Sequence, residues 1–211
     1  AGRIVIAATK TGTEKNATVF ARYWVDALRD GSADVDKNES ISALEAFQFA
    51  DRKTTSFYES QKRLATEHAV LEDTGKKEAV RAPAADNGEG LLISNFVLLR
   101  LGAAQEAAKD PAKRVLLDKR EGLERQIDTL KYQKAAMNAD DYKKQLEAAK
   151  ADLEIATKEK ASLEARYVAA VMGSVLDGDE LKVALEKAKG MTPDQIDLVA
   201  SVLPAKPKTP G

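Results

Sequence analysis

A long run of helix-forming residues in the second half of the chain constrains the fold most strongly. From Leu91 onward the sequence consists mainly of Ala, Leu, Lys, Glu and Gln, with long stretches that lack both Gly and Pro. Asp110-Pro111 is typical of a helix start, because Asp caps the amino end and Pro is tolerated at the first helical position. We therefore expect α-helices to make up most of this half.

Apolar residues recur in this half at heptad spacing, which favours helices packed along a seam. The first set is Leu116, Leu123, Leu130 and Met137. The second set, which follows a capping residue at Asn138, is Tyr142, Leu146, Ala149, Leu153, Ala156, Lys160, Leu163, Tyr167 and Ala170. The pattern predicts an antiparallel coiled-coil hairpin over residues 101–172, with a tight turn near Asn138. Two interpretations stay open: the hairpin packs on its own domain, or it projects as an arm that engages a partner.

The first hundred residues have the pattern of an α/β protein. Ile4–Ala8 is a β-branched apolar run that predicts a strand buried on both faces, in a parallel or mixed sheet. No other run is as good a strand candidate, so we expect its neighbours in an upstream part of the protein or in a second chain. Helices are expected over 17–29 and 42–64, and a short strand over 67–71.

Loops and short helices complete the expected organisation. Residues 73–90 contain several Gly, Pro, Asp and Asn residues and are expected to form a long surface loop. After the hairpin, residues 173–203 carry two short helical patterns, Asp179–Lys189 and Thr192–Val202. Residues 204–211 form a Pro-rich tail without core residues. The fold class is thus an α/β fragment with one buried strand plus helices, followed by an all-α hairpin and short C-terminal helices.

Composition narrows the chemistry that this chain can perform. The 33 basic and 34 acidic residues give a net charge of −1, which argues against general nucleic-acid binding. No apolar run is long enough for a membrane span. The absence of Cys and the single His exclude thiol nucleophiles, disulfides and most zinc and histidine-base chemistry. We expect no catalytic residue in this chain.

The segment 34–45 carries oxygen-bearing side chains at the spacing of an EF-hand calcium loop. The candidate metal ligands are Asp34, Asp36, Asn38, Ser40, Ser42 and Glu45. Alternate side chains and one carbonyl would point inward, and the final Glu45 would bind bidentately. Glu39 stands at the sixth position, where Gly is usual, and must adopt a positive φ if the loop keeps this shape. The alternative is an Asp- and Asn-rich turn whose Ser42 caps the next helix; calcium is the only cofactor that the sequence indicates.

The loop that follows the first strand is the best location for a ligand site. Its candidate residues are Thr9, Lys10, Thr11, Gly12 and Asn16. Ligands of open α/β sheets bind at the carboxyl ends of strands, where this loop lies. The glycine spacing of a phosphate-binding loop is absent. His68 has neither Cys nor a Ser-centred motif beside it, and we expect its role to be structural.

Four segments of the first hundred residues together resemble a known family. They are residues 3–12, 16–20, 33–47 and 63–73. In this order they resemble the C-terminal part of bacterial caspase/legumain-like domains. The resemblance implies a strand that follows the catalytic cysteine, a substrate-pocket loop, a helix, and an Asp-rich turn leading into another helix. It covers just under half of the chain, and the helical second half lies outside it.

The resemblance places the family's catalytic His and Cys upstream of the matching segment, and nothing here corresponds to them. His68 therefore does not inherit a catalytic role. Two hypotheses follow. In the first, the chain is the non-catalytic structural and interaction part of an exported bacterial caspase-like protein, periplasmic or extracellular, with a coiled-coil arm for assembly. In the second, it is the small-chain equivalent of a processed cysteine peptidase. Both imply that its partner is the upstream part of the protein or a second chain, in a homo- or hetero-oligomer.

Overall fold

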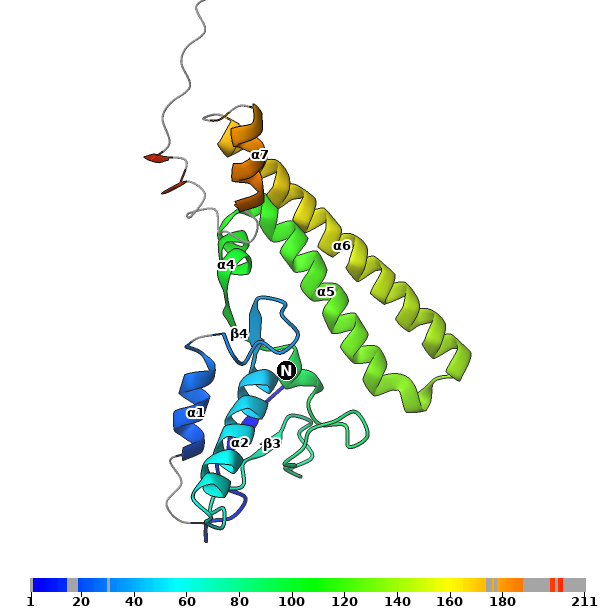
Figure 1. Cartoon of the computed structure of the whole chain (residues 1–211). Coiled ribbons are helices and arrows are strands. Elements are labelled where there is room, and N and C mark those ends of the chain that lie inside the picture. The colour runs from blue at the N-terminus through cyan, green and yellow to red at the C-terminus, as the bar shows by residue number, and fades with distance from the viewer. Residues whose placement is uncertain are drawn as a thin grey trace, which may run out of the picture. The chain divides into compact units, whose positions relative to one another are not determined.

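The computed structural model describes residues 2–14, 19–29, 31–173, 176, 178–187, 198–199 and 201–202. The chain divides into two compact units. The first comprises residues 1–101 and 124–149, and the second comprises residues 102–123 and 150–211. The described residues form a mixed α/β structure in which helices predominate (Figure 1).

Four short strands form two antiparallel pairs in the first unit. The strands are β1 (Val5–Ala7), β2 (Ser40–Ser42), β3 (Val70–Glu72) and β4 (Val97–Arg100). β1 pairs with β3, and β2 pairs with β4. β3 confirms the short strand expected near residues 67–71, whereas β4 was not foreseen.

The expectation for the first strand was wrong. β1 lies antiparallel to β3 of the same chain, with Val5 opposite Glu72 and Ala7 opposite Val70. Val5 is 43% exposed, so β1 is not buried on both faces. The reason is that β3, all of whose residues are buried, supplies a partner within the chain. β1 then needs to bury only one face.

The helices largely follow the expected pattern. They are α1 (Val19–Ala27), α2 (Ala43–Ser60), α3 (Leu91–Ser94), α4 (Gly102–Lys109), α5 (Pro111–Gln133), the 3-10 helix η1 (Lys134–Ala136), α6 (Ala139–Gly173) and α7 (Gly178–Lys187). α2 ends at Ser60, four residues before the expected end at residue 64, because Lys62 adopts a left-handed φ of 52° that a helix cannot include. α7 corresponds to the expected helix 179–189. Most of the expected helix 192–202, and all of the tail 204–211, lie outside the described residues.

The core of the first unit forms where α1 packs against α2. Phe20 and Phe47 meet edge to face with ring centroids 5.9 Å apart, beside the fully buried Leu71 and Ile93. A neighbouring cluster buries Ile41 of β2 together with small residues of both helices. Ile41 is the apolar eighth position of the candidate calcium loop, so this loop is anchored in the core.

α5 and α6 run side by side in opposite directions and are joined through η1 (Figure 1), while the expected coiled-coil packing between them stays a prediction. The expected caps are present: Lys113 N donates to Asp110 Oδ1 at 3.4 Å, and Asp140 N donates to Asn138 Oδ1 at 2.9 Å. From residue 139 to 160, the only positions that are not exposed are the six of the expected seam, from Tyr142 to Lys160. Among the described helices, none combines the length and the apolar character needed to cross a membrane.

The aromatic contact in the core generates a prediction. Phe47→Ala removes a side chain that is 1% exposed, and we expect it to lower the free energy of unfolding by about 3–5 kcal/mol. Phe96→Ala removes a ring that is 55% exposed and should change stability by less than about 1 kcal/mol. Denaturant unfolding of both variants measures the difference. Equal losses would contradict the placement of Phe47 in the core.

Candidate functional site

The loop between α1 and α2 brings together three of the six expected metal ligands. One carboxylate oxygen from each of Asp34, Asp36 and Glu45 lies within 4.8 Å of the other two. Asp34 is buried, Glu45 is half-buried and Asp36 is exposed. Hard cations such as calcium prefer oxygen ligands of this kind. The donor set therefore fits a divalent cation.

The backbone of the loop has the strained conformation that the sequence required. Lys37 and Glu39, the fourth and sixth positions, have φ values of 59° and 64°. A left-handed conformation costs a residue other than Gly about 1–2 kcal/mol. Asp34 compensates, because its two carboxylate oxygens accept the N–H groups of Asn38 at 3.2 Å and Glu39 at 3.1 Å. The predicted positive φ of Glu39 is confirmed.

Asn38 and Ser40 lie in the middle of the loop. Asn38 Oδ1 accepts the N–H of Ser40 at 2.8 Å, and Asn38 Nδ2 donates to Asp36 Oδ2 at 3.2 Å. Ser40 is only 3% exposed, and among the described residues its hydroxyl has no hydrogen-bond partner. A buried hydroxyl of this kind is normally satisfied by ordered water or a bound ion.

Ser42 and Glu45 also form a capping box at the start of α2. Glu45 N donates to Ser42 Oγ at 3.2 Å, and Ser42 N donates to Glu45 Oε2 at 2.9 Å. Glu45 Oε1 accepts the N–H of Val35 at 3.0 Å. The helix-capping role of Ser42 is thus confirmed. Glu45 Oε2 also accepts the Ser42 hydroxyl at 2.9 Å, so the lone pair that Glu45 can offer to a metal is the second one of Oε1.

The carboxylates of the loop repel one another. Partial burial of its carboxyl group, together with the negative charges of Glu45 and Asp34, raises the pKa of Asp36 above its ordinary value. A divalent cation among these oxygens would remove the repulsion, since a bound ion is the largest local charge in such a site. The loop is therefore electrostatically suited to a cation.

The expected pocket loop after β1 is held by an acid that sequence reasoning did not single out. Glu14 Oε1 lies 2.8 Å from His68 Nδ1, and Glu14 Oε2 accepts the N–H of Lys10 at 3.0 Å. Burial alone would raise the pKa of Glu14, but the hydrogen bonds from His68 and Lys10 outweigh it and lower the pKa. His68 therefore links this loop to the segment that precedes β3.

The structure describes four of the five residues proposed for the pocket. Thr9 is half-buried, whereas Lys10, Thr11 and Gly12 are exposed. Asn16 lies outside the described residues. Thr11 Oγ1 is 2.8 Å from Thr13 Oγ1, so the turn is closed by contacts among its own side chains.

Glu67 is a buried carboxylate that the sequence pattern did not reveal. It is 3% exposed and accepts the N–H of Val19 at 3.0 Å and that of Phe20 at 2.8 Å. Its Oε1 also accepts the hydroxyl of Tyr58 at 3.1 Å. The carboxylate thus satisfies the first turn of α1, where unpaired N–H groups and the helix dipole favour a negative charge.

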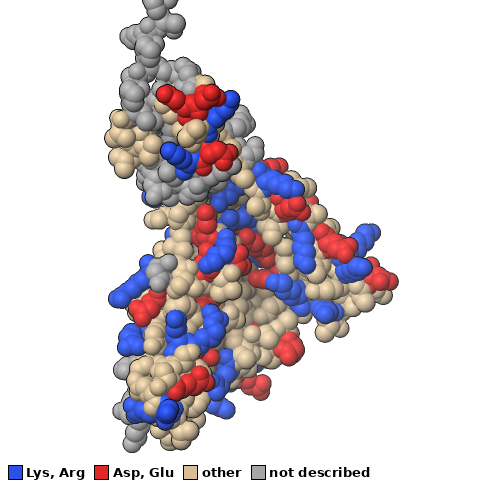
Figure 2. Space-filling view, in the orientation of Figure 1, with Lys and Arg blue, Asp and Glu red and all other residues tan. Residues whose placement is uncertain are grey.

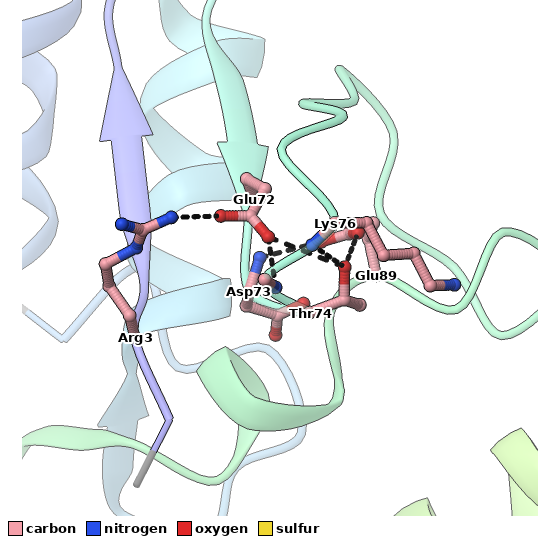
Figure 3. A network of polar contacts seen from close by, with 7 residues as sticks. Arg3, Glu72, Asp73, Thr74, Lys76 and Glu89 are labelled. Atoms are coloured by element: carbon pink, nitrogen blue, oxygen red, sulfur yellow. Dashed lines mark hydrogen bonds and ion pairs between the residues drawn. The ribbon is translucent and has the colours of Figure 1, made fainter.

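A second group of buried acids surrounds the turn after β3 (Figure 3). Glu72 accepts from Arg3 and from the N–H of Gly75, and Glu89 accepts the N–H of Asp73 at 2.7 Å and the hydroxyl of Thr74. Burial of the Glu72 carboxyl opposes its ionisation, but the hydrogen bond from the N–H of Gly75 and the Arg3 side chain outweigh it and lower the pKa of Glu72. The network pins both ends of the loop 73–90.

Tyr132 of α5 joins this network. Its hydroxyl donates to the carbonyl oxygen of Glu89 at 2.8 Å. Burial, together with the charges of Asp73, Asp128 and Glu89, raises the pKa of Tyr132 to about 12. Gly90 has a φ of 111°, and a Cβ there would lie 2.6 Å from the Tyr132 hydroxyl, so only glycine fits.

Comparison with known proteins adds no relative: no family model, curated protein or solved structure matches this chain.

On the described part of the face in Figure 2, acidic and basic side chains are interspersed rather than gathered by sign. The function is therefore inferred from the residues of the loop.

The buried carboxylate of Glu67 generates a prediction. In Glu67→Gln, one acceptor oxygen becomes an amide donor that faces N–H groups, so we expect a loss of about 1–3 kcal/mol in the free energy of unfolding. Glu78→Gln, at an exposed position, is the matched control and should be nearly neutral. Urea unfolding checks both. A neutral Glu67→Gln would contradict the role of Glu67 as a helix cap.

The raised pKa of Asp36 generates a pH prediction. The raised pKa means that the folded state prefers the protonated Asp36 carboxyl. Protonated Asp36 therefore stabilises the fold fully at pH values below the ordinary pKa of 3.8, and this stabilisation is lost as the pH rises through the pKa of the folded state. Asp36→Asn mimics the protonated form. In calcium-depleted buffer we expect the variant to match the original chain at acid pH and to exceed it in stability at neutral pH. Unfolding curves across this pH range measure the difference; a variant less stable at neutral pH would contradict the repulsion.

Proposed function

We propose that this chain is a calcium-binding structural and interaction module with no catalytic residue of its own. The observation that carries the proposal is the convergence of the oxygens of Asp34, Asp36 and Glu45 within 4.8 Å, at the first, third and twelfth positions of an EF-hand spacing. The positive φ values at the fourth and sixth positions and the buried Ile41 at the eighth support it.

The proposed ligands come from both ends of the connection between α1 and α2. Asp34 and Asp36 precede β2, whereas Glu45 belongs to the first turn of α2. Asn38, Ser40 and Ser42 would complete the set with side-chain or carbonyl oxygens. Calcium, when bound, supplies a double positive charge that offsets the repulsion of the carboxylates. A bound cation would thus fix α2 to the loop and hold the β2–β4 pair.

The resemblance of residues 3–100 supports a wider proposal. The module would be the C-terminal part of an exported bacterial caspase-like protein, with the hairpin as an arm for assembly with the upstream part or a second chain. The alternative proposal is the small chain of a processed cysteine peptidase, in which Thr9–Gly12 would shape a specificity pocket. The gene sequence upstream of residue 1 separates them: a His-Gly pair and a Cys at strand ends favour the peptidase, and other residues there favour the scaffold.

Calcium should stabilise the folded chain. Because a ligand that binds only the folded state stabilises it by mass action, calcium at 100 times its Kd should add about 2.7 kcal/mol to the free energy of unfolding. Glu45→Gln keeps a residue that the capping box accepts but removes the charge, so we expect it to lose most of this gain. Thermal unfolding with and without millimolar calcium provides the measurement.

The matched control is Glu59→Gln, at an exposed position near the end of the same helix. This variant should keep the full response to calcium. If millimolar calcium does not change the melting temperature of the original chain, the loop is a capped turn and not a calcium site. An equal loss in both variants would show that the response does not come from the loop.

A further inference from the structure

The loop 73–90 contains the one Asn-Gly pair of the sequence, Asn87-Gly88. Because Gly has no Cβ, its backbone nitrogen is the least hindered one for an attack on the side-chain amide of the preceding Asn. Asn87 is exposed, so water reaches it. The local sequence therefore makes Asn87 the most reactive asparagine of this chain.

The reaction at such a pair is the loss of ammonia from the side chain. The Gly88 nitrogen attacks Asn87 Cγ, and a new N–Cγ bond forms. The Cγ–Nδ2 bond breaks, and Nδ2 leaves as ammonia with the proton of the Gly88 N–H. Water then opens the cyclic imide at either carbonyl carbon and leaves an aspartyl or an isoaspartyl residue. Water is the only other reactant.

The closed loop opposes this reaction at both reacting groups. The Gly88 N–H donates to the carbonyl oxygen of Ala84 at 3.1 Å, which holds its proton in place. Asn87 Oδ1 accepts the N–H of Ala84 at 3.2 Å and that of Glu89 at 3.1 Å. Asn87 Nδ2 donates to the carbonyl oxygen of Ala82 at 2.9 Å. The amide must break these hydrogen bonds before it can turn toward the Gly88 nitrogen.

Glu89 connects this turn to the network that closes the loop. Its N–H is bound by Asn87, while its carboxylate accepts the N–H of Asp73 and the hydroxyl of Thr74 (Figure 3). Opening of the loop at Glu89 therefore also releases one side of the Asn87 amide. Local openings of this kind cost less free energy than global unfolding.

We propose that Asn87 is a deamidation site that the closed loop protects, and that deamidation holds the loop open once it has occurred. A carboxylate at this position has no donor for the carbonyl oxygen of Ala82, so two oxygens face each other where Nδ2 now donates. Its negative charge adds to those of Asp86 and Glu89 nearby in the sequence. The released ammonia is not recovered, so the change is permanent. The inference does not depend on the calcium site.

Peptide mapping by mass spectrometry tests the protection. The full chain is incubated at neutral pH, folded in buffer and unfolded in guanidinium chloride, and the ammonia lost at Asn87 is followed over time. We expect the folded chain to deamidate at least about tenfold more slowly, since reaction requires a local opening. Equal rates in the two states would overturn the protection.

Thr74→Val tests whether the network controls the reaction, because it removes the hydroxyl that donates to Glu89 and keeps the size of the side chain. The loss of one hydrogen bond should populate the open loop roughly two- to tenfold more, and we expect deamidation of the folded variant to be faster by the same factor. Thr157→Val, at an exposed position of α6, is the matched control and should react at the original rate. An unchanged rate in a folded Thr74→Val chain would overturn the role of the network. If this variant does not fold, the comparison of folded and unfolded original chain decides.

Asn87→Asp supplies the aspartyl product directly and tests the open loop. We expect amide hydrogen exchange in residues 82–90 to be roughly two- to tenfold faster than in the original chain, because a hydrogen bond is replaced by repulsion. Gln145→Glu adds the same charge at an exposed position of α6 and should exchange as the original chain does. Unchanged exchange in Asn87→Asp would show that deamidation leaves the loop closed.

Discussion

Carboxylates that accept hydrogen bonds from the first turns of helices are the interaction on which the first unit depends. Glu67 receives the opening N–H groups of α1, Glu45 the N–H of Ser42 at the N-cap of α2, and Asp73 those of Gly90 and Ile93 at α3. Two of these acids flank β3. The short segment from Glu67 to Asp73 therefore fixes where two helices begin, and the buried residues of β3 pack against the helices so placed.

In the candidate calcium loop, carboxylates likewise accept hydrogen bonds from backbone N–H groups. The oxygens of Asp34 accept hydrogen bonds from the backbone of the turn. Those of Glu45 accept from Ser42 at the start of α2 and from the N–H of Val35. The loop is thus held in its shape by its own N–H groups. Ile41 anchors this shape in the core, which explains how Glu39 tolerates a left-handed conformation. The proposed cation would add charge neutralisation to a loop that is already formed.

Local sequence patterns predicted the elements whose stability is local. The Asp110-Pro111 start and the cap at Asn138 follow from local helix signals, and the structure confirms both. The heptad positions from Tyr142 to Lys160 are also the positions of 139–160 that are not exposed. The oxygen spacing from Asp34 to Glu45 also depends on neighbours in sequence. β4 and the pairing of β1 with β3 were missed, because strand pairing depends on which distant segment supplies a partner.

The sequence by itself determined the two long helices α5 and α6, the caps of α2 and α6, and the set of oxygen donors in the loop, because each arises from residues a few positions apart. Only the tertiary structure decided which acids are buried. Glu67, Glu72 and Glu89 have no distinctive spacing, and their roles come from N–H groups that the fold brings to them. It also placed Glu124 beside Asn38, since a contact across 86 positions depends on how α5 packs and not on any local pattern.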